Sequence, residues 1–206
     1  QNVAPVLVYK EVRQALNLAV DKKAIVDSVL DGYGKVIDGP VPEKTVDSLI
    51  GIATNANRIE QAKAILTKAG WKENADGIFE KNSPARTGDK KNTVTLSFSI
   101  STGDAPELKE TALLLQKQWK EMGAQVSVKI FEIGDLNQNI IRPRKYDSLL
   151  FGEIIGRDLD LYPFWHSSQR NTPGLNIAFY TNIKADKFLE NIRKTTDKKL
   201  LKEYLD

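Results

Sequence analysis

The fold is decided by residues 93–133, which read TVTLSFSISTGDAPELKETALLLQKQWKEMGAQVSVKIFEI. Residues 93–100 alternate between apolar and hydroxyl side chains, a pattern typical of a strand that buries one face. Residues 124–133 also alternate, through three apolar positions. Between these two stretches, apolar side chains recur at helical spacing over residues 105–122. The stretch therefore predicts a strand, a helix and a second strand.

The predicted helix has a defined start and a defined end. Asp104 and Glu107 have the spacing of a capping box, and Gly123 follows the last turn. Trp119 belongs to the apolar stripe, so we expect its side chain to be largely buried. The stripe consists of Leu108, Ala112, Leu115, Trp119 and Met122.

The alternation of strands and helices continues downstream. A short helix is expected near residues 135–141, and residues 147–155, DSLLFGEII, are apolar enough for a buried strand. This order is that of a βαβαβ unit. It predicts an α/β fold with a mainly parallel sheet flanked by helices, in which residues 93–100, 124–133 and 147–155 are neighbouring strands.

Apolar residues also recur at helical spacing on both sides of this unit, which predicts further helices. These helices are expected over residues 12–19, 21–30 and 58–69, and again after residue 184. Asp21 has the position of an N-cap for the second of these helices. The sequence NADG, residues 74–77, has the composition of a turn between short strands. We expect residues 1–206 to form a single α/β domain.

Composition narrows the class of protein. Hydrophobic residues make up 41% and charged residues 28% of the chain, which is typical of a globular protein. The net charge is +3 and the charges of both signs are interspersed, so no nucleic-acid-binding surface is predicted. There is no cysteine, which excludes disulfides, thiolate nucleophiles and zinc sites built on sulfur.

Polar and aromatic residues gather directly after the predicted strand 147–155. In a parallel sheet, ligands bind beyond the carboxyl ends of the strands, and the segment GRDLDLYPFWHSS, residues 156–168, begins at such an end. Glu153, Arg157 and Asp158 are therefore candidates to face a binding cleft. Trp165 is either a wall of the ligand site or the apolar anchor of a returning loop.

Metal-binding and nucleophilic chemistry are not supported by this segment. A calcium loop that starts at Asp158 needs a glycine and a glutamate where the chain has Pro163 and Gln169. His166 is the single histidine, and no nucleophile elbow accompanies it. Two alternatives to a binding protein stay open: a hydrolase that uses the carboxylates of Glu153 and Asp158, and a scaffold domain without a ligand.

Four blocks of sequence resemble one family. They are EVRQALNLAVDKKAIVDSVLDGYGKVIDGPVP (11–42), AKAILTKAGW (62–71) followed by DGI (76–78), YDSLLFG (146–152) and GLNIAFYTN (174–182). In order and spacing, roughly residues 8–206 resemble the bacterial extracellular solute-binding proteins of family 5. These proteins serve ABC importers that take up oligopeptides, dipeptides and nickel.

The resemblance implies one lobe of a two-lobed, periplasmic-binding-protein-like fold of type II. Family members are more than twice as long, and the four blocks belong to their second lobe. We therefore expect residues 1–206 to be a C-terminal lobe that is cut at both ends. The implied function is to capture a small solute, which we expect to be peptide-like, and to deliver it to a membrane permease.

The resemblance also sets expectations about partners and location. The implied partners are the solute, the missing N-terminal lobe of the same chain and an ABC permease, with no nucleic acid. We expect a monomer that is not an enzyme and holds no cofactor or metal. The implied location is periplasmic or extracellular, with a lipid anchor as one possible form of attachment.

The chain departs from the peptide-binding members at two positions after Gly152. Where they have a tryptophan, this chain has Glu153, and where they have the aspartate that holds the free amino group of a peptide, it has Gly156. Asp158 is the nearest acid that could take over. The resemblance adds Arg142 and Asn176, on either side of the segment. The expected ligand-facing residues are Arg142, Glu153, Gly156, Arg157, Asp158, Trp165 and Asn176.

Overall fold

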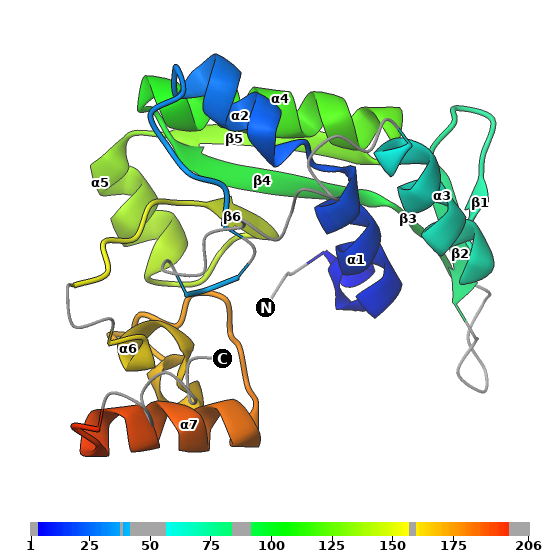
Figure 1. Ribbon diagram of the computed structural model, residues 1–206. Helices are drawn as coiled ribbons and strands as arrows, with labels where there is room; N and C mark the ends of the chain where they lie inside the picture. Colours follow the sequence, from blue (N-terminus) through cyan, green and yellow to red (C-terminus); the bar gives the residue numbers. More distant parts are fainter. Residues whose placement is uncertain (1–3, 38, 42–56, 84–91, 157–159, 198–206) are drawn as a thin grey trace.

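The computed structural model describes residues 4–37, 39–41, 57–83, 92–156 and 160–197, and its strands form two three-stranded sheets (Figure 1). The parallel sheet has the strand order β5-β4-β6, and the antiparallel sheet has the order β1-β2-β3. The strands are β1 (Lys72–Glu73), β2 (Phe79–Ser83), β3 (Asn92–Thr95), β4 (Ser97–Gly103), β5 (Gln125–Phe131) and β6 (Ser148–Leu150).

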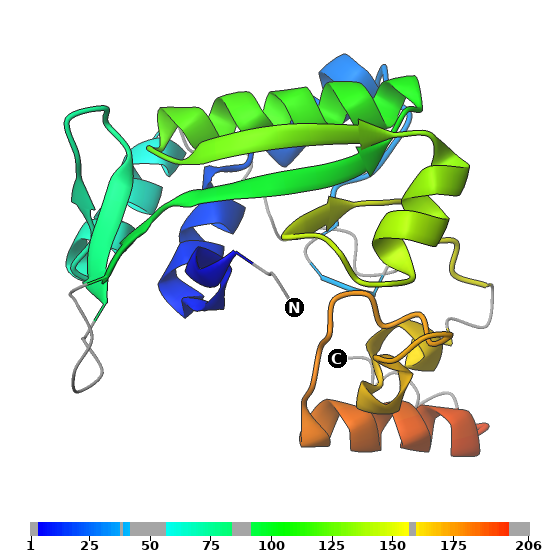
Figure 2. The same cartoon turned by 180° about the vertical axis from the view of Figure 1, so that it is seen from behind.

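The parallel sheet confirms the predicted βαβαβ unit in its main features. Strand β4 is central and pairs with β5 along its whole length, from Ser97 opposite Gln125 to Gly103 opposite Phe131. Helix α4 (Pro106–Glu121) connects these two strands and packs against both of them (Figure 2). The buried side chains of Phe98, Ile100 and Val126 form part of the hydrophobic core.

The prediction that residues 93–100 form one strand of this sheet is wrong in its first half. Strand β3 pairs antiparallel with β2, and the chain changes sheets at Leu96. The amide of Leu96 donates to Phe79 O (2.7 Å), whereas its carbonyl accepts from Gln125 N (2.9 Å). The alternating pattern continues through Leu96 because both sheets bury the same side of the chain.

The predicted strand 147–155 is also shorter in the structure. Strand β6 pairs with β4 only from Ser148 opposite Ile100 to Leu150 opposite Thr102. Residues 151–156 have no regular secondary structure, and Ile154 is 95% exposed. Strand β4 ends at Gly103, one position beyond the last pair with β6, so it offers no backbone partner to residues 152–156.

The start of α4 differs from expectation. The N-cap is Ala105, whose side chain has no hydrogen-bond acceptor, and Pro106 follows it in the first turn, so no side chain caps the helix. The capping box of Asp104 and Glu107 is therefore absent. Trp119 packs against the hydrophobic core with a minor part of its surface exposed, in agreement with the prediction: its ring contacts Phe98 (centroids 5.6 Å apart) and its Nε1 donates to Leu16 O (3.0 Å).

The N-terminal elements pack against α4 and against strands of both sheets. They are η1 (Pro5–Val8), α1 (Lys10–Ala19), α2 (Lys22–Val29) and α3 (Arg58–Lys68). Asp21 caps α2 as predicted, accepting from Ala24 N at 2.9 Å. Helix α1 packs against α3, and the turn at residues 74–77 connects β1 to β2.

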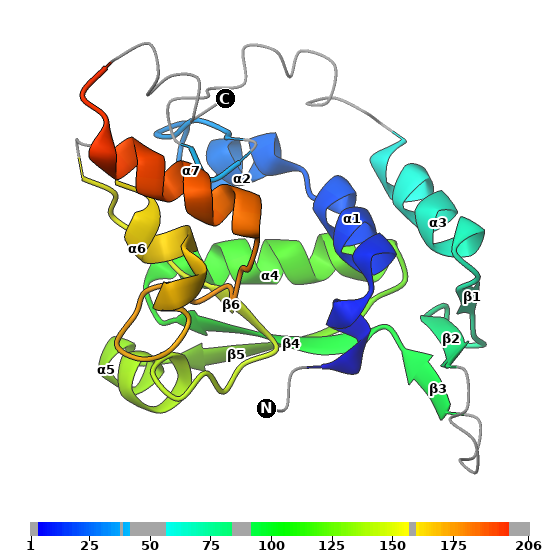
Figure 3. The ribbon, with the colours of Figure 1, turned by 90° about the horizontal axis from the view of Figure 1, so that it is seen from below.

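The C-terminal elements form a small helical region below β6 and α5, away from α3 and the β1–β3 sheet (Figures 1 and 3). The helical elements after β5 are α5 (Ile133–Asp135), the π-helix η3 (Leu136–Ile141), α6 (Tyr162–Trp165), η4 (Ser167–Gln169) and α7 (Ile183–Lys194). Among the helices in the described part of the chain, none combines the length and apolar character needed to cross a membrane.

Candidate functional site

The carboxyl ends of the three parallel strands lie at the same edge of the sheet. Strand β4 ends at Gly103, β5 at Phe131 and β6 at Leu150, and α5 and residues 151–156 follow there (Figure 2). The end of β6 is fixed to β4 by the hydroxyl of Thr102, which donates to Leu150 O at 3.0 Å. We call residues 152–156 the rim.

The rim presents an acid and an apolar side chain to solvent. Glu153, Ile154 and Gly156 are exposed, and no described residue forms a hydrogen bond or ion pair with Glu153. Partial desolvation by the surrounding protein raises the pKa of the Glu153 carboxyl above its ordinary value. The expected positions Arg157 and Asp158 lie outside the described residues.

Arg142 directly follows η3, and its side chain is exposed. Its carbonyl accepts from the hydroxyl of Thr172 (2.8 Å), so its backbone is fixed while the guanidinium remains accessible. Arg142 therefore has the accessibility that an anion-binding residue needs.

Arg144, two residues later, is buried and was not singled out from the sequence. Its Nη2 donates to Gly174 O (2.7 Å) and to Arg170 O (3.4 Å), and its Nη1 donates to Ile141 O (3.3 Å). The carbonyl of Ile141 lies at the end of η3, where helix carbonyls stabilise a positive charge. Arg144 thus joins the segment before β6 to the loop at 170–174.

Asn176 does not face a cleft, and this expectation is wrong. The side chain has 0% exposure, and its amide donates to Tyr180 O (2.9 Å) and His166 O (3.1 Å). Its Oδ1 accepts from Tyr180 N (3.0 Å). All of its hydrogen-bonding capacity is directed at backbone, so Asn176 holds the loop at 176–180 onto α6.

Trp165 belongs to the same internal packing. Its ring lies edge-on to Tyr180 with centroids 5.8 Å apart, and the side chain is only partly exposed. Of the two interpretations of Trp165, these contacts favour the apolar anchor of a returning loop over a ligand wall.

The single histidine of the chain, His166, contacts side chains of the neighbouring helices. His166 is buried, its ring stacks on Tyr162 (centroids 4.1 Å apart), and its Nδ1 accepts from Ser168 N at 3.1 Å. Its Nε2 lies 3.5 Å from a carboxylate oxygen of Glu190 and 4.0 Å from one of Asp186. These contacts join α6 and η4 to α7.

Asp160 also has a structural partner. Arg193 donates to both of its carboxylate oxygens, with Nη2 2.6 Å from Oδ2 and Nε 3.0 Å from Oδ1. The hydrogen bond from Arg193 lowers the pKa of Asp160 below its ordinary value. Across the part of the chain that the structure describes, no group of three or more acids and histidines is placed to hold a metal ion.

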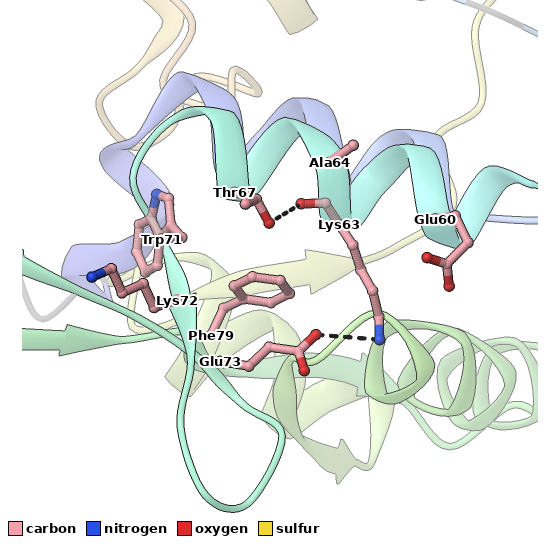
Figure 4. A pocket seen from close by; sticks show the side chains of 8 residues that line it. All are labelled: Glu60, Lys63, Ala64, Thr67, Trp71, Lys72, Glu73 and Phe79. Carbon is pink, nitrogen blue, oxygen red and sulfur yellow. Dashed lines mark hydrogen bonds and ion pairs between the residues drawn. The ribbon is translucent and has the colours of Figure 1, made fainter.

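A hollow of about 590 Å³ lies between α3 and the β1–β2 hairpin (Figure 4). The rings of Trp71 and Phe79 form its floor, and Lys63 forms an ion pair with Glu73 across it (3.3 Å). The hollow adjoins the strands that lead into the amino end of β4. It contains none of the residues expected to face a ligand.

Comparison with known proteins gives concordant results. A family model described as bacterial extracellular solute-binding proteins, family 5 Middle, matches residues 2–174. The oligopeptide-binding protein AppA of Bacillus subtilis is 34% identical over 203 residues, which are 95% of this chain and 35% of AppA.

Solved structures show the same relationship. The structure of Bacillus subtilis AppA in complex with a nonapeptide has a TM-score of 0.78 and 30% identity, covering 97% of this chain and 38% of that chain. The structure of NikZ from Campylobacter jejuni in complex with Ni(L-His) has a TM-score of 0.76 and 30% identity, with 97% and 38% coverage. The chain thus spans 35% and 33% of the first two curated relatives that it matches.

Proposed function

Because the chain belongs to the bacterial extracellular solute-binding proteins of family 5, we propose that it is the ligand-binding lobe of an ABC-importer binding protein. In this proposal the lobe closes with a second lobe of the same chain over a small solute and presents it to a membrane permease. The fold is that of a type II periplasmic-binding-protein lobe, which supports this function.

The observation that carries the proposal is the accessible rim at the carboxyl edge of the parallel sheet. Glu153 and Gly156 lie exposed directly after β6, and Arg142, which follows η3, is exposed as well. The exposed carboxylate of Glu153 suits a solute that carries a positive charge, as the amino end of a peptide does. Arg157 and Asp158 remain proposed contacts from their place in the sequence, directly after the rim.

A peptide-like solute is the proposed ligand class. The AppA structure is described as a complex with a nonapeptide, whereas NikZ is described as a complex with Ni(L-His). We favour the peptide because Glu153 at the rim offers a carboxylate to a cationic amino group, even though Gly156 stands where peptide-binding members have their aspartate. The hydrolase alternative has no supporting contact, since no described residue pairs with Glu153 as an acid or base.

The proposal extends to location and assembly. We propose a monomer on the outer side of the cytoplasmic membrane, either free or held by a lipid anchor, that docks on an ABC permease. Fractionation of cells that express the full-length protein tests the location, and sedimentation tests the monomer. Cytoplasmic recovery of the mature protein contradicts this part of the proposal.

Thermal-shift measurement on the full-length protein tests the ligand class. The panel contains a random-sequence nonapeptide pool, Ni(II) with L-histidine, and haem. A ligand present at 100 times its dissociation constant stabilises the folded state by about 2.7 kcal/mol. We expect the nonapeptide pool to raise the melting temperature. A shift with nickel–histidine or haem alone overturns the peptide assignment, and no shift with any member overturns solute capture of these classes.

A further inference from the structure

The carboxylate of Asp147, directly before β6, joins three parts of the chain. Its Oδ1 accepts from Ala4 N at 2.9 Å, across 143 positions of sequence. Its Oδ2 accepts from Ser99 N at 2.9 Å and from the Ser99 hydroxyl at 2.6 Å. One side chain therefore connects the start of β6 to β4 and to the N-terminal segment before η1.

These hydrogen bonds extend a very short strand. The first pair between β4 and β6 is Ile100 opposite Ser148, so Ser99 lies one position before the ladder begins. The carboxylate supplies the acceptor that a backbone carbonyl of β6 would supply there. Ser148 adds a bond from its hydroxyl to Ser99 O at 2.9 Å. Hydrogen bonds to an ionised acceptor are about twice as strong as neutral ones.

The strand held in this way is the strand that carries the rim. Glu153 follows the end of β6 by three residues, and β6 itself is paired over only three positions. Beyond Leu150 the rim has no ladder bonds of its own. Its place at the edge of the sheet therefore depends on how firmly the amino end of β6 is fixed.

We propose that Asp147 is a positioning residue of the binding rim. It does not touch the solute; it fixes β6 to β4 and to the segment at Ala4, and so determines where Glu153 is presented. This inference rests on the proposed function, in which the rim contacts the solute. Because Ala4 and Ser99 share the carboxylate, displacement of the N-terminal segment also displaces the rim.

The test compares Asp147→Ala and the milder Asp147→Asn with wild type in the full-length protein. Asn74→Ala is the matched control: Asn74 Oδ1 also accepts two backbone N–H groups, those of Asp76 and Ile78 (both 3.0 Å), in the turn between β1 and β2. Amide hydrogen exchange without ligand is measured over residues 148–156 and 74–78. Affinity is measured for the random-sequence nonapeptide pool, well below the melting temperature of every variant.

We expect both Asp147 variants to accelerate exchange over residues 148–156 and to weaken binding of the pool by up to about fivefold, which is the loss expected when the exposed charge of Glu153 itself is removed. Asn74→Ala accelerates exchange only at 74–78 and binds normally. Unchanged exchange at 148–156 overturns the inference whatever the ligand. Faster exchange with unchanged affinity, in a protein whose wild type binds the pool, overturns it as well. Failure of the wild type to bind the pool counts against the proposed ligand class, and exchange alone then decides whether Asp147 fixes the rim strand.

Discussion

Asn176 and Tyr180 hold each other through a reciprocal pair of hydrogen bonds. The Asn176 amide donates to Tyr180 O at 2.9 Å, and Tyr180 N donates to Asn176 Oδ1 at 3.0 Å. Asn176→Ala leaves these backbone groups and His166 O without partners inside the protein. We expect a loss of about 2–3 kcal/mol in the free energy of unfolding, measured by urea denaturation. Solute affinity of the folded variant is unchanged; a variant of normal stability that fails to bind would return Asn176 to the ligand site.

Gly174 tests the packing of the same region. A Cβ atom at this position would lie 2.1 Å from Gln169 O, a backbone atom that cannot move aside alone. Gly174→Ala is therefore expected to destabilise the protein by about 1–3 kcal/mol. Gly152→Ala is the control, because a Cβ atom there meets nothing within 4 Å. Equal melting temperatures for the two variants would contradict this account of the loop.

Asp160 is expected to contribute to the acid sensitivity of the fold. The bond from Arg193 lowers its pKa in the folded protein. Its contribution to stability is therefore complete above the ordinary pKa of aspartate, about 3.9, and is lost as the pH falls through the lowered value. We expect Asp160→Asn to lower the melting temperature of the protein at pH 6. Below pH about 4, the melting temperature of this variant should fall less steeply with decreasing pH than that of wild type. Thermal melts from pH 2.5 to 6 measure this, with exposed Asp76→Asn as the charge-matched control; parallel curves for Asp160→Asn and wild type would refute it.

Glu153 is expected to act on a cationic solute through its charge. Desolvation raises its pKa, so the carboxylate takes up a proton at a higher pH than an ordinary glutamate. Binding of a cationic peptide should therefore weaken as the pH falls through that raised value. Glu153→Gln should weaken binding about fivefold at neutral pH, as an exposed ion pair is worth up to about 1 kcal/mol, and should remove this pH dependence. Calorimetry at several pH values provides the measurement, and an N-acetylated peptide of the same sequence provides the control.

The isolated chain of residues 1–206 is expected to bind the solute weakly. A micromolar dissociation constant corresponds to about 8 kcal/mol, and one open rim leaves the contacts of the second lobe unmade. Calorimetry on the isolated lobe and on the full-length protein makes the comparison. Equal affinities would show that the rim alone makes the site.

The sequence predicted the elements better than their pairing. Periodicity identified β5 and α4 because a regular stripe of apolar side chains reports burial directly. It did not reveal that Leu96 belongs to two sheets, since the apolar alternation is the same on both sides of it. It also extended β6 into residues 151–155, three of which are large apolar residues, although the pairing with β4 ends at Leu150. Whether an apolar run pairs depends on its neighbour, which periodicity does not encode.

The residues proposed for the site differ in their accessibility. Glu153 and Arg142 are exposed, whereas Asn176 is internal. Asp147 and Arg144 were missed because they act through backbone groups far away in the sequence. The sequence around YDSLLFG does place an acid directly before an apolar run, and that position could have suggested a carboxylate that extends a short strand.

The three-residue pairing of β6 has a consequence for the order in which the lobe folds. Strands β4 and β5 are joined by one helix and can associate early, as local contacts form fastest. Strand β6 must instead find β4 across 48 positions of sequence, and Ala4 must meet Asp147 across 143. The rim is thus expected to be the last part of the lobe to assemble. If the chain is exported unfolded, as the proposed location requires, the pair of β4 and β5 is expected to form outside the cell before the rim is in place.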